Sequence, residues 1–210
     1  MGQAIEHVAA PDLDRAVAAA RRHLIPFLFT IPLTSYGIGF WLPQTLKNAS
    51  GAGEFTIGLL SAIPSAAGAI AMVIVGRNSD RTGERRLHLI FSALLSATGV
   101  VLSTFGSSTA WVVFTLSLAA GYASMFAPFW ALATASMRGV GAAAAIALIN
   151  SVGNTGGFVG PYLLGAINDA THRFTLGLYA IAILLASGSM LVLAVTGPED
   201  ERRDRGDRRV

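Results

Sequence analysis

The most regular feature of the chain is an alternation between long uncharged runs and short charged connections. Six runs are long enough to cross about 30 Å of hydrocarbon as helices, which takes roughly 17 to 25 residues each. They are Leu24–Leu46, Phe55–Val75, Leu89–Phe105, Ala110–Met137, Ala142–Ile167 and Phe174–Thr196. None shows the alternation of hydrophobic and polar residues that a membrane β-strand requires. The pattern predicts an all-α membrane protein with six transmembrane helices (24–196), an N-terminal arm (1–23) and a charged tail (197–210).

The composition agrees with this pattern and excludes several classes of function. Of the 210 residues, 53% are hydrophobic and only 13% are charged, whereas a soluble domain is about 25% charged. The chain has no Cys, so it has no disulfide and no thiolate metal site. No basic patch is interleaved with aromatic residues, so nucleic acid is not an expected partner. The lipid bilayer is the expected partner, and no metal or cofactor is expected.

An intramembrane enzyme is also not expected. Such an enzyme needs a nucleophile and a base inside the membrane. The histidines lie in the arm or in the charged connections, at His7, His23, His88 and His172.

The basic residues predict the orientation of the helices. Thirteen of the fifteen Lys and Arg residues lie in the arm, in the connections after the second and fourth runs, and in the tail. Only Lys47 and Arg173 lie on the opposite side. Cytoplasmic loops carry an excess of Lys and Arg, so both termini are predicted to be cytoplasmic. The abundance of Ala, Gly and Arg is typical of a GC-rich bacterial genome, so the expected location is a bacterial inner membrane.

One stretch inside the fifth run, Asn150–Tyr162, is rich in small and amide side chains. As a helix, it places Asn150, Asn154, Gly157 and Pro161 on one face. Two pairs of glycines have the four-residue spacing that lets membrane helices approach closely, Gly153 with Gly157 and Gly156 with Gly160. Unpartnered amides are costly in hydrocarbon, so this helix is predicted to lie among other helices with its amides towards a polar interior. That the amides only hold helices together is about equally well supported.

Two other runs contain residues that predict bends or a functional face. The first run contains Pro26, Pro32 and Pro43, which predict a bent helix. Tyr36, which lies deep in this run, is a candidate for a hydroxyl that faces a cavity. In the fourth run Tyr122, Phe126 and Trp130 follow one another at four-residue steps, an arrangement that more often indicates packing than function. Pro128 predicts a local distortion of that helix.

The connection after the second run has a regular pattern of glycines and charges. It reads Gly76-Arg-Asn-Ser-Asp-Arg-Thr-Gly-Glu-Arg-Arg86. Asp80 is placed to accept hydrogen bonds from a neighbouring helix N-terminus, although the arginines alone also serve as a topology signal. The pattern resembles the cytoplasmic loop signature of the major facilitator superfamily. The residues that carry this resemblance are Gly76, Asp80, Arg81, Gly83, Arg85 and Arg86.

Three further stretches narrow the resemblance to one family. Phe40–Gln44, Pro128–Leu132 and Ala147–Tyr162 together resemble the anion:cation symporter family, which contains bacterial permeases for tartrate, phthalate, sugar acids and related organic anions. The resemblance covers about Leu24 to Thr196. It matches helices seven to twelve of a twelve-helix transporter, which form its C-terminal half.

The resemblance implies a function and a set of site residues. The implied function is proton-coupled transport of a small organic anion by alternating access, with two six-helix halves moving about a central site. The tryptophan and asparagine that the family contributes to this site match Trp130 and Asn150. Asn154 and Tyr36 are added from their positions and chemistry. The residues of the loop signature are expected to form a cytoplasmic gate.

No charged residue lies in any of the six runs. The chain alone therefore has no cation to hold an organic anion in the membrane and no titratable group to carry a proton. The resemblance places the family's carboxylate-binding arginines and proton-carrying acids in the N-terminal half. The sequence therefore predicts that this chain does not transport alone. A six-helix homodimer and a non-functional truncated remnant remain open alternatives.

Overall fold

A computed structural model of the chain describes residues 24–135 and 141–193. The predicted arm and tail, Arg138, and the predicted ends of the fourth and sixth spans lie outside these residues. The described residues form helices and no strand. The elements are α2 (Ile25–Ser50), α3 (Glu54–Thr82), α4 (Arg85–Leu102), α5 (Thr109–Ala119), the 3₁₀ helix η2 (Ala120–Met125), α6 (Phe126–Ala135), α7 (Gly141–Asn154), α8 (Gly156–Thr171) and α9 (Phe174–Leu193).

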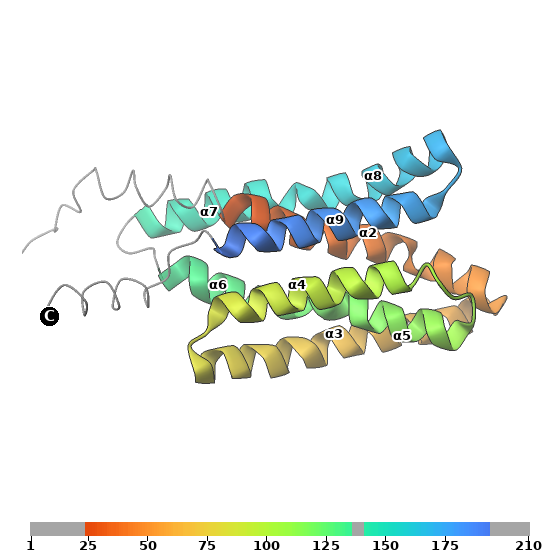
Figure 1. Cartoon of the computed structure of the whole chain (residues 1–210), viewed down its shortest axis with the longest axis horizontal. Helices are drawn as coiled ribbons and strands as arrows, with labels where there is room; N and C mark the ends of the chain where they lie inside the picture. Colours follow the sequence, from red (N-terminus) through yellow and green to blue (C-terminus); the bar gives the residue numbers. More distant parts are fainter. Residues whose placement is uncertain (1–23, 136–140, 194–210) are drawn as a thin grey trace, which may run out of the picture.

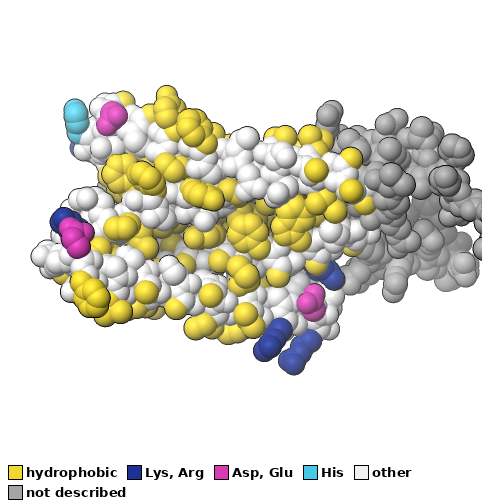
Figure 2. Space-filling model, turned by 180° about the vertical axis from the view of Figure 1, so that it is seen from behind, with side chains coloured by type: hydrophobic (Ala, Val, Ile, Leu, Met, Phe, Trp, Pro, Cys, Tyr) yellow, Lys and Arg dark blue, Asp and Glu magenta, His cyan; other side chains and the backbone are white. Residues whose placement is uncertain are grey.

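These elements make six candidate membrane spans, because α5, η2 and α6 follow one another as one span and α7 and α8 as another. The predicted all-α architecture with six transmembrane helices is therefore confirmed. Successive spans run in opposite directions along one bundle (Figure 1). The connections α2–α3, α4–α5 and α8–α9 lie at one end, and the α3–α4 connection lies at the other. Charged side chains gather at the two ends of the bundle, with an uncharged surface between them (Figure 2).

The helices end at residues that can take the required backbone conformations. Gly51 ends α2 and Gly83 ends α3, each in the left-handed region, with φ of 62° and 74°. Glycine adopts this region without the steric cost that a Cβ imposes. Ser108 precedes α5 and its hydroxyl accepts a hydrogen bond from the backbone N–H of Trp111, which satisfies one of the free donors at the start of that helix.

The second span is longer than predicted, and this corrects the description of the signature stretch. Helix α3 continues past Val75 to Thr82, and α4 begins at Arg85 instead of Leu89. Only Gly83 and Glu84 lie between the two helices. The prediction that residues 76–86 form a loop is therefore wrong. An uncharged run marks where hydrocarbon ends, but helical hydrogen bonding continues in water until a residue such as Gly83 stops it.

The fourth and fifth spans are both interrupted near their middle. In the fourth, the 3₁₀ segment η2 ends at Met125, and Pro128 in the first turn of α6 has no N–H to donate to the carbonyl of Ser124. The predicted distortion of this span is therefore present, one turn before the proline. In the fifth, Thr155 separates α7 from α8. The sequence predicted one continuous helix over Ala142–Ile167, whereas the structure divides it into two helices at Thr155.

The core is hydrophobic, with a few buried hydroxyls where helices approach closely. Phe27 of α2 and Phe129 of α6 lie at its centre, with their rings 5.9 Å apart. Between α4 and the fourth span, the hydroxyl of Ser124 in η2 donates to that of Ser92 at 2.8 Å, and the hydroxyl of Ser96 donates to the carbonyl of Ala119 at the end of α5. A buried hydroxyl in hydrocarbon needs such a partner, so these bonds fix how the third and fourth spans cross.

Candidate functional site

The break in the fifth span at Thr155 lies directly after the two candidate amides, Asn150 and Asn154. The N–H of Thr155 donates to the carbonyl of Val152 at 3.2 Å, and the N–H of Phe158 donates to the carbonyl of Thr155 at 3.1 Å. These bonds span three residues instead of four, so the chain tightens locally. Pro161 cannot donate to the carbonyl of Gly157, which loosens the regular ladder at the same place. Asn154 is consequently the last residue of α7.

Asn150 and Asn154 lie one turn apart and are bonded to each other. The Nδ2 of Asn154 donates to both the backbone carbonyl and the Oδ1 of Asn150, at 2.8 Å each. This arrangement uses the side-chain oxygen of Asn150 and leaves its Nδ2 group, for which no partner is present in the described part of the chain. An –NH₂ group has two donors and no acceptor. The exposed end of this pair therefore suits an acceptor such as a carboxylate or a hydroxyl oxygen.

Both amides are exposed on the outside of the bundle. Within the described residues the amide side of the fifth span is therefore not covered by other helices, and that it faces a polar interior stays a prediction. Its opposite side is buried against α2, and the amide side is open. Exposed donors within a membrane span are costly unless another polar surface meets them.

Four glycines of the fifth span lie against α2, namely Gly153, Gly156, Gly157 and Gly160. A Cβ at Gly156 would overlap the carbonyl oxygen of Phe29, and one at Gly160 would overlap that of Leu33. A Cβ at Gly153 would lie 2.6 Å from Cδ2 of Leu28, and one at Gly157 would lie 2.9 Å from the ring of Tyr36. The absence of side chains lets α8 approach the backbone of α2. This contact fixes the face on which the amides are displayed.

Tyr36 lies on the same side of the bundle as the amide pair. Its ring edge packs on Gly157, which is one turn beyond Asn154, and the side chain is 60% exposed. Phe40 and Gln44 continue the exposed side of α2 at four-residue steps. On α8, Phe158 and Tyr162 are exposed and stacked, with ring centroids 6.1 Å apart.

We call these exposed residues the polar–aromatic face. It consists of Tyr36, Phe40 and Gln44 of α2 and Asn150, Asn154, Phe158 and Tyr162 of α7 and α8. The sequence interpretation missed Phe158 and Tyr162 as members of this face. Their four-residue spacing from Asn154 was the available signal.

Trp130 lies elsewhere. It is half-buried on α6, packed against the main hydrophobic core, and its ring meets that of Phe129 edge-on at 5.3 Å. No hydrogen bond or ring contact joins Trp130 to the amide pair among the described residues. The structure therefore brings together three of the four candidate residues, namely Tyr36, Asn150 and Asn154, and leaves Trp130 apart from them. Tyr122 and Phe126 are likewise half-buried against the core.

The signature residues form a compact turn at the end of the bundle. Asp80 and Arg85 form an ion pair with an oxygen-to-nitrogen distance of 3.9 Å. Gly76 is buried, and a Cβ there would lie 3.2 Å from that of Ala127 on α6. Arg81 is exposed in the last turn of α3, and Arg86 is half-buried in the first turn of α4. The ring of His88 bonds to the carbonyl of Glu84 and lies 3.0 Å from Nδ2 of Asn78. The ion pair thus links α3 to α4 across Gly83.

The opposite end has a second ion pair of a different kind. Lys47 and Glu54 lie 2.6 Å apart, on either side of the turn between α2 and α3. Both side chains are exposed, so this pair contributes at most about 1 kcal/mol. Among the described residues no group of His, Asp and Glu could hold a metal ion.

Comparisons with known proteins give these observations a context. The sequence profile of the Major Facilitator Superfamily matches residues 24–209. The chain is 40% identical over 168 residues to a putative tartrate transporter of Agrobacterium vitis, which covers 79% of this chain and 39% of the relative. It is 38% identical over 178 residues to a quinolone resistance transporter of Acinetobacter baumannii, which covers 83% of this chain and 41% of the relative.

A solved structure shares the fold. The crystal structure of the E. coli fucose:proton symporter FucP matches with a TM-score of 0.74 at 13% identity, over 93% of this chain and 47% of the symporter. The chain therefore spans less than half the length of the relatives and the structure that it matches. These relatives and this fold are those of membrane transporters, which are not enzymes.

Proposed function

Since the chain belongs to the major facilitator superfamily, a conclusion that the profile match to residues 24–209 establishes, we propose that it is the C-terminal half of an organic-anion transporter. The transporter carries a small carboxylate or sugar acid across the bacterial inner membrane, coupled to protons, by alternating access. The share of each relative that is matched, 39% and 41%, supports the assignment of one half. The motif order, which resembles helices seven to twelve, supports the C-terminal half. The Agrobacterium vitis relative is a putative tartrate transporter, which supports the substrate class.

The observation that carries the proposal is the exposed amide pair on the polar–aromatic face. Placing an amide in the bilayer without a hydrogen-bond partner costs free energy. This face is therefore expected to meet a polar surface or a water-filled cavity instead of lipid. The second half of the transporter supplies such a surface. Asn150 then points its Nδ2 donors into the space between the halves, where the anion binds.

The site residues divide the work between them. Asn150 donates to a carboxylate or hydroxyl oxygen of the substrate, and Asn154 and Tyr36 complete the same side of the cavity. Trp130 of α6 offers its indole N–H as a further donor, a role that rests on the family resemblance alone. The charged residues of the described spans lie near the span ends, outside the six uncharged runs. The cation that neutralises the anion and the acid that carries the proton therefore belong to the other half.

The signature turn forms the cytoplasmic gate of this half. The Asp80–Arg85 ion pair holds α3 and α4 together at the end of the bundle that carries most of the arginines. By the positive-inside rule this end is cytoplasmic, and so are both termini. The exposed Arg81 is free to contact the other half when the cytoplasmic side closes.

Uptake by two co-expressed halves tests the proposal. The chain is expressed with the N-terminal half of the Agrobacterium vitis tartrate transporter, and uptake of labelled tartrate is measured in cells. Uptake is expected only when both halves are present. A hydrogen bond to a charged group contributes about 1.5 to 3 kcal/mol, so Asn150→Ala is expected to lower uptake roughly 10- to 100-fold. Trp130→Ala is expected to lower it in the same direction.

The matched control is Asn168→Ala. It removes an amide near the C-terminal end of α8, away from the amide pair. Uptake by Asn168→Ala is expected to equal that of the unchanged chain. If neither Asn150→Ala nor Trp130→Ala lowers uptake, the site assignment is wrong. If the chain expressed alone gives the same uptake and crosslinks as a dimer, the homodimer is the functional form and the half-transporter proposal fails.

A further inference from the structure

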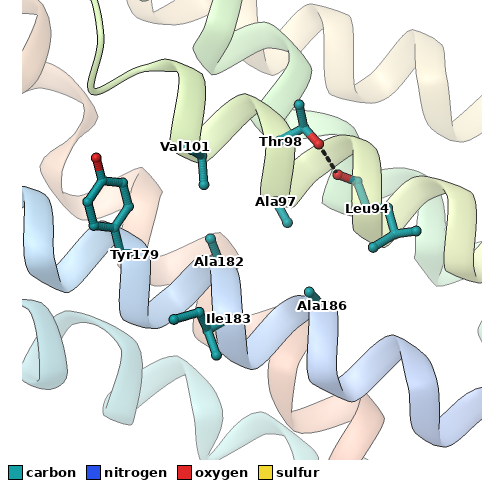
Figure 3. A pocket seen from close by; sticks show the side chains of 8 residues that line it. All are labelled: Leu94, Ala97, Thr98, Val101, Tyr179, Ala182, Ile183 and Ala186. Carbon is teal, nitrogen blue, oxygen red and sulfur yellow. Dashed lines mark hydrogen bonds between the residues drawn. The ribbon is translucent and has the colours of Figure 1, made fainter.

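A groove between α4 and α9 lies on a different side from the amide pair and has a different chemistry. It has a volume of about 460 Å³ and is lined by Leu94, Ala97 and Val101 of α4 and by Tyr179, Ala182 and Ile183 of α9. The two helices run side by side there, with small alanine side chains facing each other between the larger ones (Figure 3). The alanines leave the space that the groove occupies, since two packed helices with larger residues at those positions would close it.

The polar atoms at the groove are already bonded within the chain. The hydroxyl of Thr98 donates to the carbonyl of Leu94 in its own helix at 2.8 Å. The hydroxyl of Tyr179 lies 3.0 Å from that of Thr104, within hydrogen-bond distance. The hydroxyl hydrogens of both side chains can thus be used within the chain, so the walls offer an occupant no free donor. A cavity with apolar walls does not hold ordered water, because water needs two to four polar partners.

The groove lies around the middle of the third and sixth spans. It extends along α4 from Leu94 to Val101, which corresponds to about 10 Å at a rise of 1.5 Å per residue. This is about a third of the hydrocarbon thickness of about 30 Å. It lies in the half of α4 nearer to the α4–α5 connection.

We propose that this groove binds one acyl chain of a membrane phospholipid. The surroundings favour a lipid over a protein partner. Ile183 is 67% exposed and Leu94 is 41% exposed at the rim. The exposed hydroxyl of Ser187, near the groove, is also bonded to its own helix, at the carbonyl of Leu184. This side offers only aliphatic surface, whereas the polar–aromatic face offers unused amide donors.

Photolabelling of the whole chain in a bilayer tests the proposal. The chain is reconstituted in vesicles of phosphatidylethanolamine and phosphatidylglycerol that contain a trace of phosphatidylethanolamine with a photoreactive group on one acyl chain. After irradiation, the label on each peptide is quantified by mass spectrometry. Residues 94–101 and 179–186 are expected to carry several-fold more label than the exposed side of α3 around Ile70. Equal labelling of the two regions in the unchanged chain would overturn the proposal.

A variant that fills the groove gives a second measurement. Ala186→Phe places a ring at the half-buried end of the groove and is expected to lower its labelling several-fold. The control Ala69→Phe adds the same ring on the exposed side of α3 and is expected to leave groove labelling unchanged. Unchanged labelling in a folded Ala186→Phe protein contradicts the proposal.

A single Cys at the rim distinguishes a lipid from a second copy, because the natural chain has no Cys. Thr98→Cys is expected to remain monomeric under mild oxidation. A disulfide-linked dimer through Thr98→Cys, formed with loss of groove labelling, would identify another copy as the occupant and overturn the lipid assignment. This inference does not rest on the proposed transport function, since the label is measured in the chain alone.

Discussion

Tyr36 and Ile183 are almost equally exposed, at 60% and 67%, and both lie near the middle of a membrane span, yet the surfaces around them differ. Tyr36 belongs to a face that displays amide donors and aromatic rings. Ile183 belongs to a side where aliphatic groups are exposed and the hydroxyls of Thr98 and Ser187 bond to their own helices. Fractional exposure therefore does not tell what a membrane residue meets, whereas the use of nearby polar atoms does.

The two sides also differ in how they are built. The polar–aromatic face depends on backbone contact, because Gly156 and Gly160 bring α8 directly against carbonyl groups of α2. The apolar side depends on contacts between side chains of α4 and α9, which leave a groove. The first arrangement fixes the direction of particular donors. The second leaves space for a flexible chain that needs no directional contact.

The largest expected effect comes from a lysine placed on each side. A charge at the bilayer centre costs about 2.5 to 3.5 kcal/mol on insertion scales. Ile183→Lys is therefore expected to lower the yield of folded protein strongly, whether or not an N-terminal half is co-expressed, because this side faces lipid. Tyr36→Lys is expected to lower the yield of the chain alone and to recover when the other half covers the polar–aromatic face. The yield is measured as monodisperse protein by size-exclusion chromatography.

The results for the two lysine variants can also contradict the assignment of the two sides. If co-expression rescues Ile183→Lys and Tyr36→Lys equally, the other half does not select the polar–aromatic face. If it rescues only Ile183→Lys, the assignment of the two sides is reversed.

A smaller effect is expected from closing the backbone contact beneath the polar–aromatic face. Gly156→Ala places a Cβ on the carbonyl oxygen of Phe29, and overpacking of this kind typically costs 1 to 3 kcal/mol, here about 2 kcal/mol. The measurement is thermal unfolding of the purified chain. Gly165→Ala is the matched control, because nothing lies within 4 Å of a Cβ at that position in the same helix. Equal melting temperatures for the two variants would show that the close approach of α2 and α8 is not needed.

The sequence was sufficient for the architecture because hydrocarbon imposes one simple requirement. Uncharged runs separated by arginines have few other solutions than six helices, and the spacing of Gly156 and Gly160 indicated a close helix contact. The end of α3 was missed because hydropathy reports where the membrane stops, and the helix continues through Asp80 to Thr82. The helix ends at Gly83, which takes the left-handed backbone conformation. Hydropathy is averaged over many residues and does not detect such a single position.

The candidate site was only partly accessible from the sequence. The helical period placed Asn150 and Asn154 on one face, and the structure agrees that they lie together. The period does not say whether a face is covered, because this depends on how α2 and α8 pack. Trp130 illustrates the same limit. Its position on α6 depends on the 3₁₀ segment before it, which turns the aromatic positions of the fourth span relative to a straight helix.

The smallest expected effect tests whether the hydroxyls of the apolar side are needed at all. Thr98→Val keeps the shape of the side chain and removes a hydroxyl that bonds only to Leu94 of its own helix. Exposed substitutions of this kind usually change the free energy of unfolding by no more than about 0.5 kcal/mol. The thermal midpoint of the chain and the labelling of its groove by photoreactive lipid are therefore both expected to stay unchanged. Asn154→Leu is the counterpart on the polar–aromatic face, where the lost bond also held the amide of Asn150, and it is expected to lower transport by the two halves without changing the midpoint. A loss of groove labelling in Thr98→Val would mean that the hydroxyl contacts the occupant, and the groove would then resemble the polar–aromatic face in kind instead of standing opposite to it.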